Sequence, residues 1–234
     1  MATITVHHRV DRPDLALGLV RVEGIEVTQA STALGLELER WIAERRRRPL
    51  DAEEERVRQG CREVLRNRRY RPTGRGKPAS EYLLREAAEG SFPRVSGPVD
   101  ANNLVSLASC VPISVWDLDL GASSEIEVRL GAAGERYVFN GAGQVLELED
   151  LVCGCAFHDD GASAPLVTPI KDSMATKVQV SSQRLAGCIY YPIAAGSRSQ
   201  LERITGELLK WLLTCGSSVR GQLALCSPGE TVTL

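Results

Sequence analysis

Residues 92–119 read FPRVSGPVDANNLVSLASCVPISVWDLD, and this stretch decides the fold. Its first half has the pattern of a helix, with Asp100 well placed as the N-cap. The apolar face of that helix follows from three residues at helical spacing, Leu104, Leu107 and Ala108. Its second half, PISVWDLD, is a short apolar run typical of a buried strand. The stretch therefore predicts a helix that leads directly into a core strand.

Upstream of this stretch, β-rich runs give way to helices. Alternating residues in VRVEGIEV predict a strand pair that turns at Glu23-Gly24. From about position 30 the period changes to that of a helix, whose apolar residues are Leu34, Leu38, Trp41 and Ile42.

Two further helices are expected before position 92. Asp51 followed by Glu54 has the spacing of a capping box, which marks the start of the second helix. The third helix reads EYLLREAAEG, and we expect Ser80 to cap it and Gly90 to close it. The turn-rich RPTGRGKP separates the two.

The second half of the chain is rich in strands. After the core strand come short apolar segments separated by Gly, Ser, Asn and Asp, and then an amphipathic helix, SQLERITGELLKWLLTCG. We predict an α+β protein with a mixed or antiparallel sheet and flanking helices. We expect one domain over residues 1–234, with a strand pair and Arg-rich helices in 1–92, a strand-rich pocket core in 93–195 and a C-terminal helix in 196–216. The expected strands are EIEVRL, ERYVFN, QVLELED, LVCGCAF, TKVQV and RLAGCIYY.

Composition excludes several classes of protein. With 43% hydrophobic and 25% charged residues, the chain has the balance of a soluble globule. No basic segment followed by an apolar one marks the N-terminus as a secretory signal, and the apolar run 185–197 is too short to span a bilayer. Seven cysteines cannot all pair within one chain. We therefore expect reduced thiols, a cytoplasmic location and no contact with membranes.

Basic residues are concentrated between positions 40 and 77. This window holds fourteen basic and six acidic residues, a charge of +8, which leaves −10 for the rest of the chain. Guanidinium groups bind phosphate through paired hydrogen bonds, so this polarity predicts a face that contacts RNA. The alternative is a solvated helical face whose arginines pair with nearby acids. The acids cluster at one helix start, where the helix dipole favours them, and this leaves later arginines unpaired. The candidate RNA-binding residues are Arg45, Arg46, Arg47, Arg48, Arg66, Arg68, Arg69, Arg71, Arg75 and Lys77.

The sequence gives little support for a metal site or a cofactor site. Cys153, Cys155 and His158 are three soft ligands within six residues, as at the start of a zinc site. Cys-x-Cys in a strand points both thiols to one face, however, and no second pair lies at a usual spacing, so we interpret these cysteines as buried small hydrophobes. His7 and His8 receive no role. No nucleophile elbow, phosphate loop or zinc-protease motif occurs, and we expect no cofactor, no metal and no catalytic residue that a motif assigns.

Residues 92–119 resemble the B3/B4 domain of the bacterial phenylalanyl-tRNA synthetase β subunit, and are more similar still to free-standing proteins built on that domain. The similarity extends upstream to a Tyr-Arg-Pro turn at positions 70–72, and downstream to IEVRLGAAGERYVFNG, LVCGCAFHDD and Thr176-Lys177-Val178. It is strong over residues 92–119 and weak after position 160. The positions that carry it are Pro93-Arg94, Val99-Asp100, Asn103, Pro112 and Asp117.

This resemblance implies an aminoacyl-tRNA quality-control module. In the synthetase the domain receives the 3′ end of mischarged tRNA and hydrolyses tyrosine from phenylalanine tRNA. The implied partner is therefore tRNA rather than DNA, and the implied site is a substrate pocket. By position, Arg94 would hold the terminal ribose or phosphate and Asn103 would orient the turn that shapes the pocket. The remaining pocket residues would be Pro112 and Ser114 on one wall, with Thr176 and Lys177 approaching from the opposite strands.

Two departures from the family pattern bear on the activity. The synthetase has His where this chain has Ser114, and it has Glu near the late strand where this chain has Gly187 and Cys188. Losing both groups puts tyrosine editing in doubt. Three hypotheses remain: hydrolysis of mischarged aminoacyl-tRNA in trans, RNA binding without catalysis, and binding of an amino acid or another small molecule on the same fold. The oligomeric state stays open.

Overall fold

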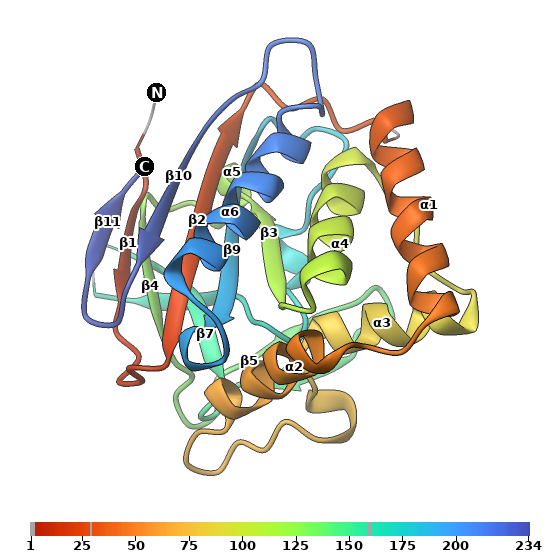
Figure 1. The fold of residues 1–234 in the computed structure, drawn as a ribbon. Coiled ribbons are helices and arrows are strands. Elements are labelled where there is room, and N and C mark those ends of the chain that lie inside the picture. The colour runs from red at the N-terminus through yellow and green to blue at the C-terminus, as the bar shows by residue number, and fades with distance from the viewer. Residues whose placement is uncertain (1–2, 29, 159–160) are drawn as a thin grey trace.

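The computed structural model describes residues 3–28, 30–158 and 161–234, which form three layers (Figure 1). A layer of helices covers one face of a four-stranded sheet, and a five-stranded sheet covers its other face. The last two residues of LVCGCAFHDD, at 159 and 160, lie outside the described residues. The expected α+β class with mixed and antiparallel strands is confirmed.

The central sheet is buried on both faces along three of its four strands, and the edge strand of residues 220–226 is largely exposed. Its strands alternate strictly, so that Leu15, Leu17 and Leu19 face the second sheet while Ala16 and Val20 face the helices. This double burial explains why its strands read as nearly continuous apolar runs rather than as alternating ones. In spatial order the strands are β10 (Arg220–Cys226), β2 (Leu15–Glu23), β9 (Arg184–Pro192) and β3 (Ile113–Asp117), each antiparallel to its neighbour.

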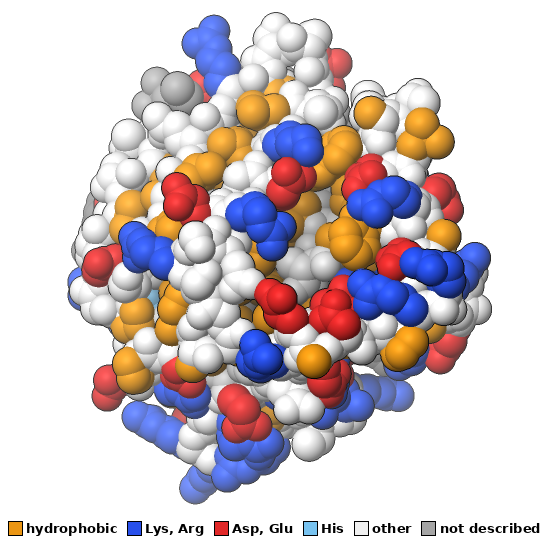
Figure 2. All heavy atoms as spheres, viewed as in Figure 1, with side chains coloured by type: hydrophobic (Ala, Val, Ile, Leu, Met, Phe, Trp, Pro, Cys, Tyr) orange, Lys and Arg blue, Asp and Glu red, His pale blue; other side chains and the backbone are white. Residues whose placement is uncertain are grey.

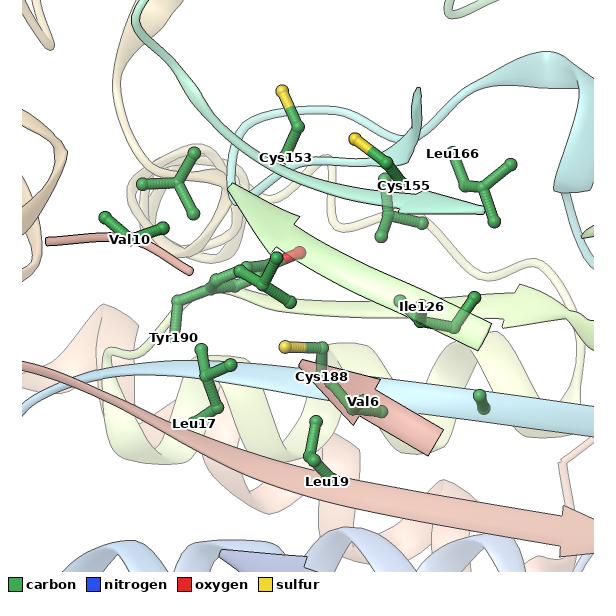
Figure 3. Close-up of a cluster of buried hydrophobic side chains, with 14 of the residues drawn as sticks. Val6, Val10, Leu17, Leu19, Ile126, Cys153, Cys155, Leu166, Cys188 and Tyr190 are labelled. Atoms are coloured by element: carbon green, nitrogen blue, oxygen red, sulfur yellow. The ribbon is translucent and has the colours of Figure 1, made fainter. Parts of the chain in front are cut away.

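The outer sheet packs on the central one through a mainly apolar core. Figure 3 shows Val6, Ile126 and Cys155 of the outer sheet near Cys188 and Tyr190 of β9. In this sheet only the β1–β4 pair is parallel. Its spatial order is β11 (Thr231–Thr233), β1 (Thr5–His8), β4 (Glu125–Leu130), β7 (Val152–Phe157) and β8 (Ser163–Val167), and a separate hairpin joins β5 (Arg136–Val138) to β6 (Val145–Glu147).

The helices pack on the central sheet and on one another. In Figure 1, α6 and α4 lie in front of the central strands, with α1 beside α4. Gly18 of β2 permits this close approach, because a Cβ there would lie 2.2 Å from Oγ1 of Thr205 on α6. The described helices are α1 (Thr32–Arg47), α2 (Ala52–Leu65), α3 (Ala79–Glu89), α4 (Gly97–Ser109), α5 (Leu118–Gly121) and α6 (Arg198–Leu212), with 3-10 turns η1 (Gly74–Gly76), η2 (Met174–Thr176) and η3 (Ile193–Ala195). None of them, within the described residues, has the length and apolar character that a membrane span requires.

Local signals predicted several element boundaries correctly. The capping box of Asp51 and Glu54 is present at the start of α2. Gly90 closes α3 in the left-handed conformation at a φ of 87°. The helix pattern from about position 30 is α1, and the late amphipathic pattern is α6.

Two predicted helix starts and one predicted strand are wrong. Asp100 is not an N-cap, because α4 begins earlier at Gly97 with Pro98 in its first turn; Asp100 instead accepts a hydrogen bond from the Val95 amide. Ser80 does not cap α3, whose N-cap is Pro78. TKVQV is not a strand: its first residue ends η2, and the rest has no strand assignment.

The predicted strand pair at Glu23-Gly24 is also wrong. The strand β2 ends at Glu23, and the chain leaves the sheet at Gly24, which has a φ of 79°. Residues 25–28 could form a hairpin with β2 only along one of its edges, and both edges are already paired, one with β10 and one with β9. The strands β8, β10 and β11 were not expected. The strand β11 has only three residues and β10 is largely exposed, and both properties weaken the apolar pattern that identifies a strand.

Candidate functional site

Six exposed basic side chains lie on the loop between α2 and α3, residues 66–78, which we call the basic loop. Lys and Arg side chains gather in Figure 2 at the lower edge of the molecule, where Figure 1 places this loop. All six belong to the predicted RNA-binding set, so this part of the prediction coincides with an exposed, positively charged surface. The six are Arg66, Arg68, Arg69, Arg71, Arg75 and Lys77.

The backbone of the basic loop is held by its own hydrogen bonds. The Tyr70 hydroxyl donates to the Gly76 carbonyl at 2.7 Å, and Tyr70 packs against the inter-sheet core. The Arg71 guanidinium donates to the carbonyls of Arg68 and Tyr70. The Arg69 amide donates to the Asp150 carboxylate at 3.0 Å. These bonds give the cations a defined backbone, which reduces the entropy lost when they bind a ligand.

The acids near the basic loop neutralise it only in part. Arg68 lies 3.7 Å from Asp150 and Arg69 lies 3.4 Å from Glu149, and both guanidinium groups are largely exposed. The Arg69–Glu149 pair is exposed on both sides, and such surface pairs contribute little and are easily exchanged for other anions. Arg75 and Lys77 form no ion pair with the residues that the structure describes.

The arginines of α1 and α2, in contrast, hold the helices together. Arg45 is buried: its guanidinium lies 2.6 Å from Glu54 and donates to the carbonyls of Leu107 and Ala108 at the end of α4. It is not accessible to a nucleic acid, and its assignment to an RNA-binding face is wrong. Burial opposes ionisation of Glu54, but hydrogen bonds from Arg48, the Asp51 amide and Arg45 outweigh it and hold the Glu54 pKa at about 2.

The other arginines of these helices also have partners. Arg46 donates to the Ala87 carbonyl of α3, and Arg47 and Arg48 both pair with Glu44. Along α2, two arginines reach across to Glu81 of α3. The expectation that arginines beyond the acidic cluster are unpaired is therefore wrong for α2, since both pair with an acid of another helix and one of them, Arg58, also pairs with Glu55 of the cluster. The two are Arg58 and Arg62.

A polar cluster interrupts the apolar core between the sheets. The Oγ atom of Ser114, on β3, lies 2.7 Å from Oδ1 of Asp172, 3.1 Å from the Thr168 carbonyl and 3.4 Å from the Tyr190 hydroxyl. Ser114, Thr168 and Tyr190 are almost fully buried, whereas Asp172 keeps partial contact with solvent. We call these four residues the Ser114–Asp172 cluster.

Asp172 has an unusual pKa for a carboxyl group. Desolvation raises the pKa of Asp172 to about 7, although hydrogen bonds from Ser114 and the Thr168 amide and the charge of Lys177 oppose that shift. A carboxyl group that titrates near neutral pH is a functional-site candidate. The sequence analysis missed Asp172, because one acid in the loop LVTPIKDS has no motif to distinguish it.

The Ser114–Asp172 cluster lies close to the basic loop. Lys171 precedes Asp172, and its pKa is lowered first by desolvation and then by the charge of Arg75 in the basic loop. The Lys171 ammonium also lies over the Phe139 ring at 3.9 Å. Lys171 therefore extends the positive surface of the basic loop towards the cluster.

The structure separates the six predicted pocket residues into two groups. Ser114 and Lys177 both lower the pKa of Asp172, the first by a hydrogen bond and the second by its charge. Thr176 lies nearby in η2. Pro112 directly precedes β3, and its carbonyl accepts a hydrogen bond from the Tyr190 amide. The other two, Arg94 and Asn103, lie with the helices on the opposite face of the central sheet.

Arg94 is engaged by two acids. Its guanidinium lies 2.7 Å from Glu39 of α1 and 3.1 Å from Asp100 of α4. Because Ser114 points into the core between the sheets, the two residues do not face a common hollow. None of the six lines the cavities of about 380 Å³ and about 270 Å³ that open on the helical side.

The cysteines behave as small apolar residues. All seven are buried and unbridged, and Figure 3 shows Cys153 and Cys155 side by side on β7. Desolvation raises the pKa of the Cys153 thiol well above its usual range. Within the described residues, no three His, Cys, Asp or Glu side chains gather as a metal site would require.

Comparison with known proteins does not identify a family for this chain. No protein-family model matches the chain, and no curated protein matches it. Among solved structures, the chain is similar to an N-terminal fragment of the phenylalanyl-tRNA synthetase β subunit from Pyrococcus horikoshii, with 13% sequence identity and a TM-score of 0.40. The similarity covers 53% of this chain and 41% of that one. At this score the likeness is a weak relationship that supports no statement about function.

Proposed function

We propose that this protein binds RNA through the basic loop, and that its natural ligand is transfer RNA. The observation that carries the proposal is the set of six exposed cations on one internally hydrogen-bonded loop. The resemblance of residues 92–119 to the B3/B4 domain supports transfer RNA as the class of RNA.

The charge distribution suits this proposal. Outside residues 40–77 the chain carries a charge of −10, which disfavours polyanions there, so binding depends on where its cations are concentrated. Arginine is well suited to phosphate because its planar fork donates two parallel hydrogen bonds. Of the six cations in the loop, five are arginines.

Replacing Arg69, Arg75 and Lys77 with Gln should weaken binding of transfer RNA by about tenfold or more at moderate salt. The slope of log affinity against log salt should fall by about 2 to 3, because each lost phosphate contact removes roughly one released counterion. Filter binding or fluorescence anisotropy over a salt series measures both quantities. Arg71 is left in place because it holds the loop backbone.

The matched control replaces three exposed arginines outside the basic loop, Arg85, Arg198 and Arg220, with Gln. It changes the net charge equally, so a nonspecific charge effect would weaken both variants alike. Equal affinities and equal salt slopes for the two triple variants would eliminate the basic loop as the binding surface.

A second candidate function is hydrolysis of mischarged aminoacyl-tRNA in trans, as the resemblance implies. The observation that favours it is Asp172, whose pKa of about 7 leaves it partly ionised at neutral pH beside Ser114 and close to the basic loop. In this proposal the Asp172 carboxylate takes a proton from a water that attacks the ester carbonyl. The bond between the acyl carbon and the ribose oxygen then breaks, and the proton passes to that oxygen, which leaves as a hydroxyl group. Ser114 orients the water or the carbonyl.

A panel of mischarged transfer RNAs tests this second function. At least one should lose its amino acid faster with the protein present, and Asp172→Asn should abolish that acceleration while RNA binding persists. Asp119→Asn, at an exposed acid that pairs with Arg184, is the control. If every member of the panel is stable in the presence of the protein, RNA binding remains as the proposed function and hydrolysis is rejected.

A further inference from the structure

The larger cavity, of about 380 Å³, lies in the helical layer, away from the Ser114–Asp172 cluster. It opens between α1, α2, α4 and α6, and Tyr191 of β9 contributes to its lining. This is the face seen in Figure 2, where acidic and basic side chains surround a hollow near the middle of the view. Its volume is within the range of pockets that hold small organic molecules.

Apolar and aromatic side chains form about half of the lining of this cavity, and charged and polar side chains form the rest. Aliphatic side chains from three helices form part of its lining, and Trp41 of α1 and Trp211 of α6 add two indole rings. Both rings already hold protein cations. Arg40 and the buried Arg45 lie 4.8 and 5.1 Å from the Trp41 centroid, and Lys210 lies 4.9 Å from that of Trp211. Ring faces of this kind attract cations through their quadrupole. The aliphatic residues include Val57, Leu104, Val105 and Ile204.

Charged groups in the lining are mostly acidic. Five carboxylates line the cavity against two guanidinium groups, those of Arg40 and Arg203. Glu54 is already bonded to the buried Arg45, whereas two of the carboxylates pair with exposed cations, and Glu37 also accepts from Nε1 of Trp41 at 3.1 Å. Glu37 pairs with Arg40 and Glu207 pairs with Lys210, each within one helix turn, and both cations are 58% exposed.

Such exposed pairs stabilise a helix by only a few tenths of a kcal/mol. A ligand cation can therefore displace Arg40 or Lys210 at small cost. It would gain a carboxylate at the rim and place its apolar body against the indole rings and the aliphatic lining.

We propose that this cavity binds a small organic cation, an amine or guanidinium group on an aromatic or aliphatic body. The ammonium group would bind at Glu37 and Glu207, and the body would lie between Trp41 and Trp211. This site is separate from the RNA surface, so it gives the protein a second, independent ligand.

The test uses 2-phenylethylamine as the probe, with 2-phenylethanol and 3-phenylpropanoate as neutral and anionic analogues. Two of the three tryptophans line the cavity, so ligand binding should change the intrinsic fluorescence. The third, Trp116, is buried in the inter-sheet core, and Trp116→Phe removes its background. Calorimetry measures the same affinity independently. We expect the amine to bind and the two analogues to bind at least about tenfold more weakly.

Substitutions identify the contacts. Glu37→Gln and Glu207→Gln should each weaken amine binding about fivefold, whereas Glu202→Gln, on the same helix but outside the lining, should leave it unchanged. Arg203→Gln should strengthen binding, because it removes a like charge from the rim. The proposal is overturned if the amine does not bind, if the neutral alcohol binds equally well, or if Arg203→Gln weakens binding as it would for an anion. The basic-loop triple variant should bind the amine as tightly as the wild type does. The amine result is therefore independent of whether the protein binds RNA through the basic loop.

Discussion

Arg45→Ala should lower the free energy of unfolding by about 3–5 kcal/mol, a large share of the stability of an ordinary domain. The side chain of Arg45 is only 2% exposed and lies 2.6 Å from Glu54. Its removal leaves the partly buried Glu54 carboxylate with one fewer cation, and it leaves the carbonyls of Leu107 and Ala108 without their donor. An arginine at the end of α4 also compensates the negative end of the helix dipole.

Arg47→Ala is the matched control for this prediction. Arg47 is two positions away on the same helix, is 74% exposed and pairs only with Glu44 among the described residues. We expect its removal to change the stability by about 0.5 kcal/mol or less. Urea denaturation of the two variants gives the comparison. Similar midpoints for both would show that the Arg45–Glu54 pair does not hold α1, α2 and α4 together.

Asp172→Asn should stabilise the protein by about 2–3 kcal/mol at about pH 8 and leave it nearly unchanged at about pH 4. The pKa of Asp172 is about 7 in the folded protein, against a usual value of 3.8. Between these values the folded protein keeps a proton that the unfolded chain has lost. The contribution of Asp172 to stability therefore falls as the pH rises from about 4 to about 7, and it is constant above that range.

Asparagine removes the charge but keeps an oxygen that accepts from Ser114 and the Thr168 amide. The expected gain is smaller than the roughly 4 kcal/mol that three pKa units would give, because Asp172 retains partial solvent contact. Denaturation curves of both proteins at several pH values measure the difference. A constant difference across the range would mean that Asp172 does not titrate near neutrality.

These two substitutions would also separate structure from function. A buried acid that destabilises the protein at neutral pH is typical of a functional site rather than of a core. If Asp172→Asn gains stability and loses hydrolysis of a mischarged transfer RNA, the Ser114–Asp172 cluster is catalytic. Arg45→Ala, in contrast, should leave the RNA affinity of the folded protein unchanged, because Arg45 does not reach the surface.

Local interactions explain which structural predictions succeeded. The capping box at Asp51 and the left-handed Gly90 are made by residues within four positions of one another, so they are visible in the sequence. The predictions for Asp100 and Ser80 failed because a polar residue near a helix start resembles an N-cap. In the structure both helices begin earlier, at or next to a proline, Pro98 in α4 and Pro78 before α3.

Distant contacts explain the failures at the candidate site. Arg62 looked unpaired because its partner, Glu81, lies about twenty positions away on α3. Arg45 looked exposed because the carbonyls that bury it belong to α4. Asp172 gained its pKa from the core between two sheets, and no local pattern marks such an environment.

Sequence alone determined the α+β class, most helices and the concentration of cations in residues 66–77, because periodicity, capping and charge are properties of short segments. Only the tertiary structure decided which arginines face solvent, that Arg94 and Ser114 lie on opposite faces of the central sheet, and that the described cavities open among the helices. Burial and charge pairing depend on residues brought together from distant positions, and the energies of buried polar groups are set by those neighbours.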